Sequence, residues 1–165
     1  MHHIEIDITR QTLTFFGDEQ ALVYSVSTAL NGVGEIEGSE RTPRGAHVIS
    51  EKIGGDLPVN AVLRGRQFTG EIYDSLLAEA YPNRDWILTR ILWLTGREPG
   101  FNHGVNDEGV NVDSHQRYIY IHGTPDSEPM GVAKSHGCIR MHNHDLIDLF
   151  ARVEEGVTVN IVESR

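Results

Sequence analysis

The sequence predicts a mainly β domain, a sandwich or curled barrel of seven or eight short strands with about two helices. Three observations predict it: short segments of alternating apolar and polar residues, turn residues between them, and only two segments with helical spacing. The chain has 165 residues, of which 39% are hydrophobic and 23% charged. This length and balance favour one domain over residues 1–165 with a sizeable core.

The N-terminal half begins as a series of adjacent strands. Apolar and polar side chains alternate with a period of two in segments 4–8, 13–15 and 22–26, which is typical of half-buried strands. A long loop rich in glycine follows. The turn Thr-Pro-Arg-Gly at 42–45 then leads into a strand at 46–50.

The second half mixes helices with strands. Apolar residues from 72 to 80 follow helical spacing, with Thr69 as the expected N-cap and Pro82 as the stop. Segment 86–94 is apolar on both faces, as in a central strand. Further elements are expected as a loop at 95–116, a strand at 117–124, a helix from about 143 to 156 and a strand at 157–161.

Charge and composition limit the classes of partner that the protein is expected to bind. The formal net charge of −10 argues against nucleic acid, and no apolar run approaches the roughly 20 residues that span a bilayer. The single cysteine cannot form an intramolecular disulfide. The alternating pattern starts within four residues of Met1 without a signal-peptide pattern. We expect a cytoplasmic protein if Met1 is the native start, or a periplasmic one if a leader was removed.

The one cysteine lies in the segment Ser-His-Gly-Cys-Ile-Arg-Met at 135–141. The expected strand at 117–124 carries His122, 16 residues before Cys138. A cysteine with an ordinary pKa is mostly protonated at neutral pH, and a nearby imidazole can activate it as a nucleophile. We therefore expect His122 and Cys138 to meet, with Cys138 at the entry to the C-terminal helix, where the helix dipole favours a thiolate.

These residues carry a resemblance. The pair His122-Gly123, followed after a spacer by Ser-His-Gly-Cys-Ile-Arg at 135–140, resembles the signature of the L,D-transpeptidase (YkuD) family. The resemblance implies a YkuD-like β-sandwich and a Cys–His pair that opens the bond between the diamino acid and D-alanine in peptidoglycan stem peptides. It also implies that carbapenems acylate the cysteine and that no cofactor is needed.

The resemblance implies roles for the catalytic residues. Cys138 is the nucleophile, and His122 is the base, held by the carbonyl of Gly123.

Four further motif residues are expected around the substrate. Gly137 lets the backbone turn and aim N–H groups at an oxyanion, with the Cys138 N–H as a second donor, and Ser135 orders that loop. His136 is expected to shape the substrate pocket. Arg140 either binds a substrate carboxylate or pairs with an internal acid, and the sequence does not decide between them.

Several alternatives stay open at this point. If water accepts the acyl group, the protein is an L,D-carboxypeptidase of muropeptide recycling, the outcome that the expected location favours; an amine acceptor makes it a cross-linking L,D-transpeptidase. A non-catalytic peptidoglycan-binding module and a structural zinc domain are rivals. No metal site is expected, because the histidines lack zinc-ligand spacing. Three aromatic residues are expected in the core: Trp93, Tyr118 and Tyr120.

Overall fold

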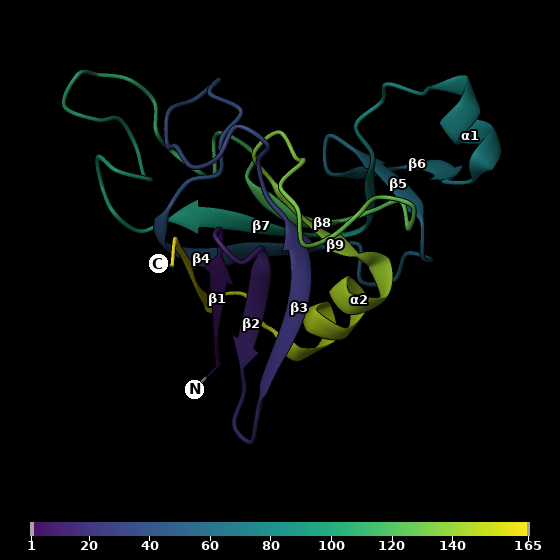
Figure 1. Cartoon of the computed structure of the whole chain (residues 1–165), viewed down its shortest axis with the longest axis horizontal. Coiled ribbons are helices and arrows are strands. Elements are labelled where there is room, and N and C mark those ends of the chain that lie inside the picture. The colour runs from purple at the N-terminus through teal and green to yellow at the C-terminus, as the bar shows by residue number, and fades with distance from the viewer. Residues whose placement is uncertain (1, 165) are drawn as a thin grey trace.

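The computed structural model describes residues 2–164 and consists of ten strands and two helices (Figure 1). The strands are β1 (His3–Asp7), β2 (Thr12–Phe16), β3 (Ala21–Ser27), β4 (Gly45–Ile53), β5 (Ala61–Arg64), β6 (Gln67–Ile72), β7 (Ile87–Gly96), β8 (Tyr120–Thr124), β9 (Ile139–His142) and β10 (Thr158–Val162). The helices are α1 (Ser75–Ala80) and α2 (Asn143–Arg152). The predicted mainly β class is confirmed.

Eight of the strands close into a barrel. Their order is β4-β10-β1-β2-β3-β9-β8-β7, and β7 pairs back onto β4. Two neighbouring pairs, β1 with β10 and β8 with β9, are parallel, and the other pairs are antiparallel. The first part of β7 pairs instead with β5, so the β5–β6 hairpin extends from the barrel together with α1 (Figure 1).

The barrel interior follows from the alternating sequence. Inward residues such as Ile4, Ile6 and Leu13 are fully buried, while their neighbours along the strands are more exposed. Helix α2 packs against β7, β8 and β9, and its apolar residues Leu146 and Leu149 complete the same core. The helical spacing predicted near 143 is therefore confirmed, and it supports the strands that carry the cysteine motif.

The expected helix starting at Thr69 is wrong in its first half. Residues 67–72 form β6 in a hairpin with β5, two strands that the sequence analysis did not identify. The helix begins only after Asp74, whose side chain accepts a hydrogen bond from the Leu77 N–H at 2.9 Å. Gly70, with φ of +88°, lies in a backbone region that an α-helix does not use.

The strand expected at 117–124 starts late. Residues 114–118 form turns, and Tyr118 has φ of +57°, so β8 begins at Tyr120. Tyr118 is 54% exposed, which corrects its expected place in the core, whereas Trp93 and Tyr120 are buried. The period-two pattern of 118–122 could not distinguish a strand from a turn that leads into one.

The buried amide of Asn143 links α2 to β7 and β8. Its Nδ2 donates to the Thr124 carbonyl and to the Asn60 Oδ1, both at 3.0 Å. Its Oδ1 accepts a hydrogen bond from the Thr89 hydroxyl at 2.7 Å. Thr124 lies two residues beyond His122 on β8, so this network fixes the strand that carries the expected base.

We expect Asn143→Ala to lower the free energy of unfolding by about 3 kcal/mol, because the Thr124 carbonyl, the Asn60 amide oxygen and the Thr89 hydroxyl proton each lose the partner that Asn143 provides. Urea unfolding measures the loss. Asn160→Ala, at an exposed strand position, is the matched control and should change the value by less than about 0.5 kcal/mol. A loss below about 1 kcal/mol for Asn143→Ala would contradict the role of the network.

Candidate active site

Cys138 lies directly before β9, next to β8. Residues 121–124 of β8 pair in parallel with residues 139–142 of β9. The thiol donates to the Tyr118 carbonyl at 3.2 Å and accepts from the Tyr120 N–H at 3.4 Å. It packs against a small apolar cluster on the outer face of the sheet, which includes Ile91 and Trp93. The strand pairing, and not a helix, therefore positions the cysteine.

This position corrects the expected helix entry. Helix α2 begins at Asn143, five residues after Cys138, so its dipole does not act on the thiol. Burial raises the pKa of the Cys138 thiol to about 12, and the Tyr120 N–H only partly offsets this effect. The free protein thus holds a neutral thiol at pH 7, and the nucleophile requires a base to remove the proton.

His122 is buried in β8, with its side chain 1% exposed. Its Nδ1 lies 2.6 Å from the Gly123 carbonyl oxygen, which can only accept, so Nδ1 carries the proton and Nε2 has a free lone pair. Burial lowers the pKa of His122, which keeps the imidazole neutral. Such an imidazole can accept a proton at Nε2.

The strand register relates the histidine to the cysteine. His122 pairs with Arg140, so these two side chains lie on the same face of the sheet, and Cys138 precedes Arg140 by two residues. Cys138, directly before β9, therefore lies diagonal to His122 of β8. The thiol proton points to the Tyr118 carbonyl in this structure, so it must leave that carbonyl before it can pass to His122.

Glycine is required at position 123. A Cβ there would overlap the Leu88 carbonyl oxygen and the Asn143 side chain. Because glycine has no Cβ, β8 can pack closely against β7 and α2 at this point. The Gly123 carbonyl can then accept the hydrogen bond from His122.

The loop before Cys138 is tightly bonded. The Ser135 hydroxyl donates to the Cys138 carbonyl at 2.5 Å and accepts from the Gly137 N–H at 3.2 Å. Thr42 Oγ1 donates to the Gly137 carbonyl at 2.9 Å. Of the two N–H groups expected to bind an oxyanion, that of Gly137 is thus engaged by Ser135. The Cys138 N–H makes no hydrogen bond within residues 2–164 and remains the available donor.

Gly137 has φ of +137°, a conformation that side chains rarely adopt. A Cβ at this position would lie 3.3 Å from the Arg41 carbonyl oxygen. The glycine therefore lets the loop turn against the 31–44 segment immediately before the cysteine.

Asp85 is a site residue that the sequence analysis missed. Its carboxylate lies 3.0 Å from an Arg140 guanidinium nitrogen and 3.6 Å from His136 Nδ1. Arg140 is thus paired with an internal acid, one of the two roles left open, and His136 lies exposed beside the same acid. Asp85 stands in the loop before β7, and no local pattern distinguishes it from other exposed aspartates.

Two cavities meet at the thiol, and both are lined by Tyr118 and Cys138. One, of about 460 Å³, is lined further by Leu63, Arg66, Ile87, Ile91 and Tyr120. The other, of about 330 Å³, is lined further by Glu37, Glu40, Arg117, His136 and Gly137. The first cavity is aromatic and cationic, whereas the second carries two exposed carboxylates.

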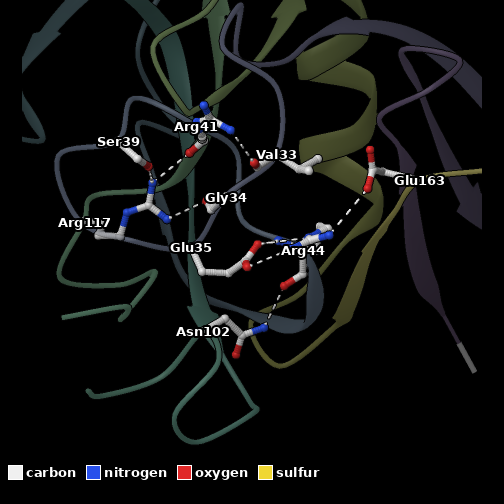
Figure 2. A network of polar contacts seen from close by, with 9 residues as sticks. All are labelled: Val33, Gly34, Glu35, Ser39, Arg41, Arg44, Asn102, Arg117 and Glu163. Carbon is white, nitrogen blue, oxygen red and sulfur yellow. Dashed lines mark hydrogen bonds and ion pairs between the residues drawn. The ribbon is translucent and has the colours of Figure 1, made fainter. Parts of the chain in front are cut away.

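A polar network holds the loop that lines the acidic cavity (Figure 2). Arg117 donates to the Arg41 carbonyl at 2.7 Å and to the Gly34 carbonyl at 3.3 Å. Arg44 binds Glu35 through two nitrogens, at 3.1 and 3.0 Å. Arg117 keeps its positive charge when it donates to the loop carbonyls, and the two carboxylates of Glu37 and Glu40 exceed it by one negative charge.

Within residues 2–164, no group of three His, Cys, Asp or Glu side chains is arranged to hold a metal ion. Over the same residues, no helix is long and apolar enough to cross a bilayer.

Alkylation of Cys138 should depend steeply on pH. A pKa raised to about 12 leaves the thiol neutral below that pH, so the iodoacetamide rate should rise about tenfold per pH unit from 7 to 10. Intact-mass measurement follows Cys138 alone, since it is the single cysteine. A rate that levels off below pH 8 would contradict the neutral thiol.

Comparison with known families gives one match over almost the whole chain. The profile of the L,D-transpeptidase catalytic domain (YkuD) matches residues 1–161. The L,D-transpeptidase candidate YkuD of Bacillus licheniformis is 49% identical over 46 residues, which is 28% of either chain. The L,D-transpeptidase candidate YqjB of Bacillus subtilis is 44% identical over 71 residues, 42% of this chain and 40% of its own.

Solved structures share the fold. An L,D-transpeptidase from Mycobacterium smegmatis matches 98% of this chain and 58% of its own, with a TM-score of 0.54 at 19% identity. An Enterococcus faecium L,D-transpeptidase, solved as a C442S mutant, matches 98% of this chain and 49% of its own, with a TM-score of 0.55 at 18% identity. The chain thus spans about half the length of these structures.

Proposed function

This chain belongs to the YkuD family of L,D-transpeptidase catalytic domains, and from that premise we propose that it is a cysteine acyltransferase acting on peptidoglycan stem peptides. The bond it opens is the L,D bond before the terminal D-alanine. The observation that carries the proposal is the position of Cys138 where two cavities meet, with the buried His122 on the adjacent strand β8.

The geometry supports a two-step reaction. His122 Nε2 takes the thiol proton while the sulfur attacks the carbonyl carbon of the diamino acid. The Cys138 N–H donates to the oxyanion that forms. When the tetrahedral intermediate collapses, the carbon–nitrogen bond breaks, and the D-alanine nitrogen takes the proton from His122. A thioester on Cys138 and free D-alanine result.

The acceptor decides the product. Water would release a tripeptide, which would make the protein an L,D-carboxypeptidase. A second candidate, cross-linking by an amine acceptor, is supported by the acidic cavity. The carboxylates of Glu37 and Glu40 in its lining would attract the ammonium group of an incoming peptide toward Cys138.

Mass spectrometry of the reaction with a disaccharide-tetrapeptide tests the proposal. Release of D-alanine is expected, with either tripeptide or cross-linked dimer as the second product. Tripeptide without dimer supports the carboxypeptidase, and dominant dimer supports the transpeptidase. Peptide binding without D-alanine release would overturn the enzyme and favour a binding module.

A carbapenem offers a test that needs no acceptor. Incubation should add one carbapenem mass to the protein, because the family resemblance implies acylation of Cys138. The Cys138→Ala variant is the control and should keep its mass. An unchanged mass of the wild type would count against a reactive Cys138.

A further inference from the structure

Arg66 is held in the larger cavity by aromatic side chains. Its guanidinium lies 4.5 Å from the ring centroid of Trp93 and 5.1 Å from that of Tyr118, and it donates to the Tyr120 hydroxyl at 3.1 Å. Stacking of this kind fixes the plane of a guanidinium. Because Cys138 lines the same cavity, a charged group of fixed orientation lies in the space beside the nucleophile.

Arg66 makes no direct contact with a carboxylate in the part of the chain that the structure describes, and the Glu51 carboxylate acts on its charge only from a distance. Within residues 2–164 Arg66 forms no ion pair, whereas Arg44, Arg84 and Arg140 each pair with a carboxylate at 3.0 Å. Arg66 is also the one charged side chain among the residues that line this cavity. A guanidinium has five N–H donors, and the Tyr120 hydroxyl takes one of them. Donors therefore remain for a ligand.

The backbone at Arg66 is unusual for an arginine. The β5–β6 hairpin turns through Gly65 and Arg66, which have φ of +55° and +65°. Glycine or asparagine normally occupies both central positions of such a turn, because other side chains are strained there. A residue that breaks the local preference and lies in a cavity beside the nucleophile indicates a function for its side chain.

We propose that Arg66 binds a carboxylate of the peptide substrate and so aligns the scissile carbonyl with Cys138. The proposal rests on the proposed function and extends it to substrate recognition. A planar guanidinium can bind a carboxylate through two parallel hydrogen bonds. Arg140, the arginine of the motif, is less suited to this role because Asp85 already binds it. The carboxylate belongs either to the leaving D-alanine or to the acyl half of the peptide.

A pair of peptides tests the proposal. Hydrolysis or transfer is measured on a tetrapeptide with free carboxylates and on the same peptide with every carboxylate amidated. We expect the wild type to prefer the free acid by about 10- to 100-fold in kcat/KM, the range for hydrogen bonds to charged groups. Arg66→Gln should reduce this ratio to near one. Arg66→Lys should keep part of it, because lysine retains the charge without the planar fork.

Arg64→Gln is the matched control. Arg64 lies on the same hairpin and is exposed, but it does not line this cavity, so the variant should keep the wild-type ratio. Peptides amidated at only one carboxylate then identify which one Arg66 binds. If amidation of one carboxylate makes kcat/KM equal for the wild type and Arg66→Gln, that carboxylate is the group that Arg66 binds.

Two results would overturn the proposal. The first is a preference for the free acid that is the same in the wild type and in Arg66→Gln. The second is a loss of kcat/KM in Arg66→Gln that is equal on both peptides, which would indicate a structural role. Failure of the proposed function is distinct, because the wild type would then release neither D-alanine from the free acid nor D-alaninamide from the amidated peptide. Equal iodoacetamide alkylation of Cys138 in both proteins shows that the site stays folded.

Discussion

The Cys138→Ala variant is expected to lose D-alanine release by at least about three powers of ten while it folds as the wild type does. The acyl-enzyme cannot form without the sulfur, and residues that act as one nucleophilic unit lose most of their rate together. The change should spare the fold, because a small side chain replaces a small one in a half-buried position. Product release by mass spectrometry measures the effect.

Thermal unfolding followed by circular dichroism is the control for this variant. Its midpoint should lie within a few degrees of the wild-type value, since removal of one sulfur atom is a small loss of packing. Residual activity above about a tenth of the wild type, in a protein that remains folded, would contradict Cys138 as the nucleophile.

The His122→Gln variant should lose about 10²- to 10⁴-fold in kcat, the contribution typical of a general base. Burial holds the Cys138 thiol neutral, so the sulfur depends on a base, and the neutral imidazole of His122 is the base assigned to it. Glutamine keeps a donor that can reach the Gly123 carbonyl, so β8 should retain its structure. Steady-state kinetics on the disaccharide-tetrapeptide gives the loss.

A double variant separates a base from a structural residue. Because the two residues act on one proton, His122→Gln combined with Cys138→Ala should be no slower than Cys138→Ala alone. A loss of less than about tenfold in His122→Gln alone would show that another group removes the thiol proton.

The sequence predicted most of the barrel from local patterns. Alternation at 4–8 and 22–26 and helical spacing after Asn143 each reflect burial of one face of one element, which neighbouring residues reveal. The local residue pattern did not predict the strands that form only because they pair with strands distant in the sequence. Residues 67–72 are a strand because they pair with β5, and residues 139–142 are a strand because they pair with β8 and β3.

The sequence by itself determined the chemical identities at the candidate site: one cysteine, His122 before a glycine, and the Ser-His-Gly loop. Only the tertiary structure decided which side chains surround them and how protonated the thiol is. Asp85 and Arg66 come from loops distant in the sequence, and they lie near Cys138 because β7 pairs with both β5 and β8. The thiol is neutral because burial, which depends on every packed neighbour, raises its pKa.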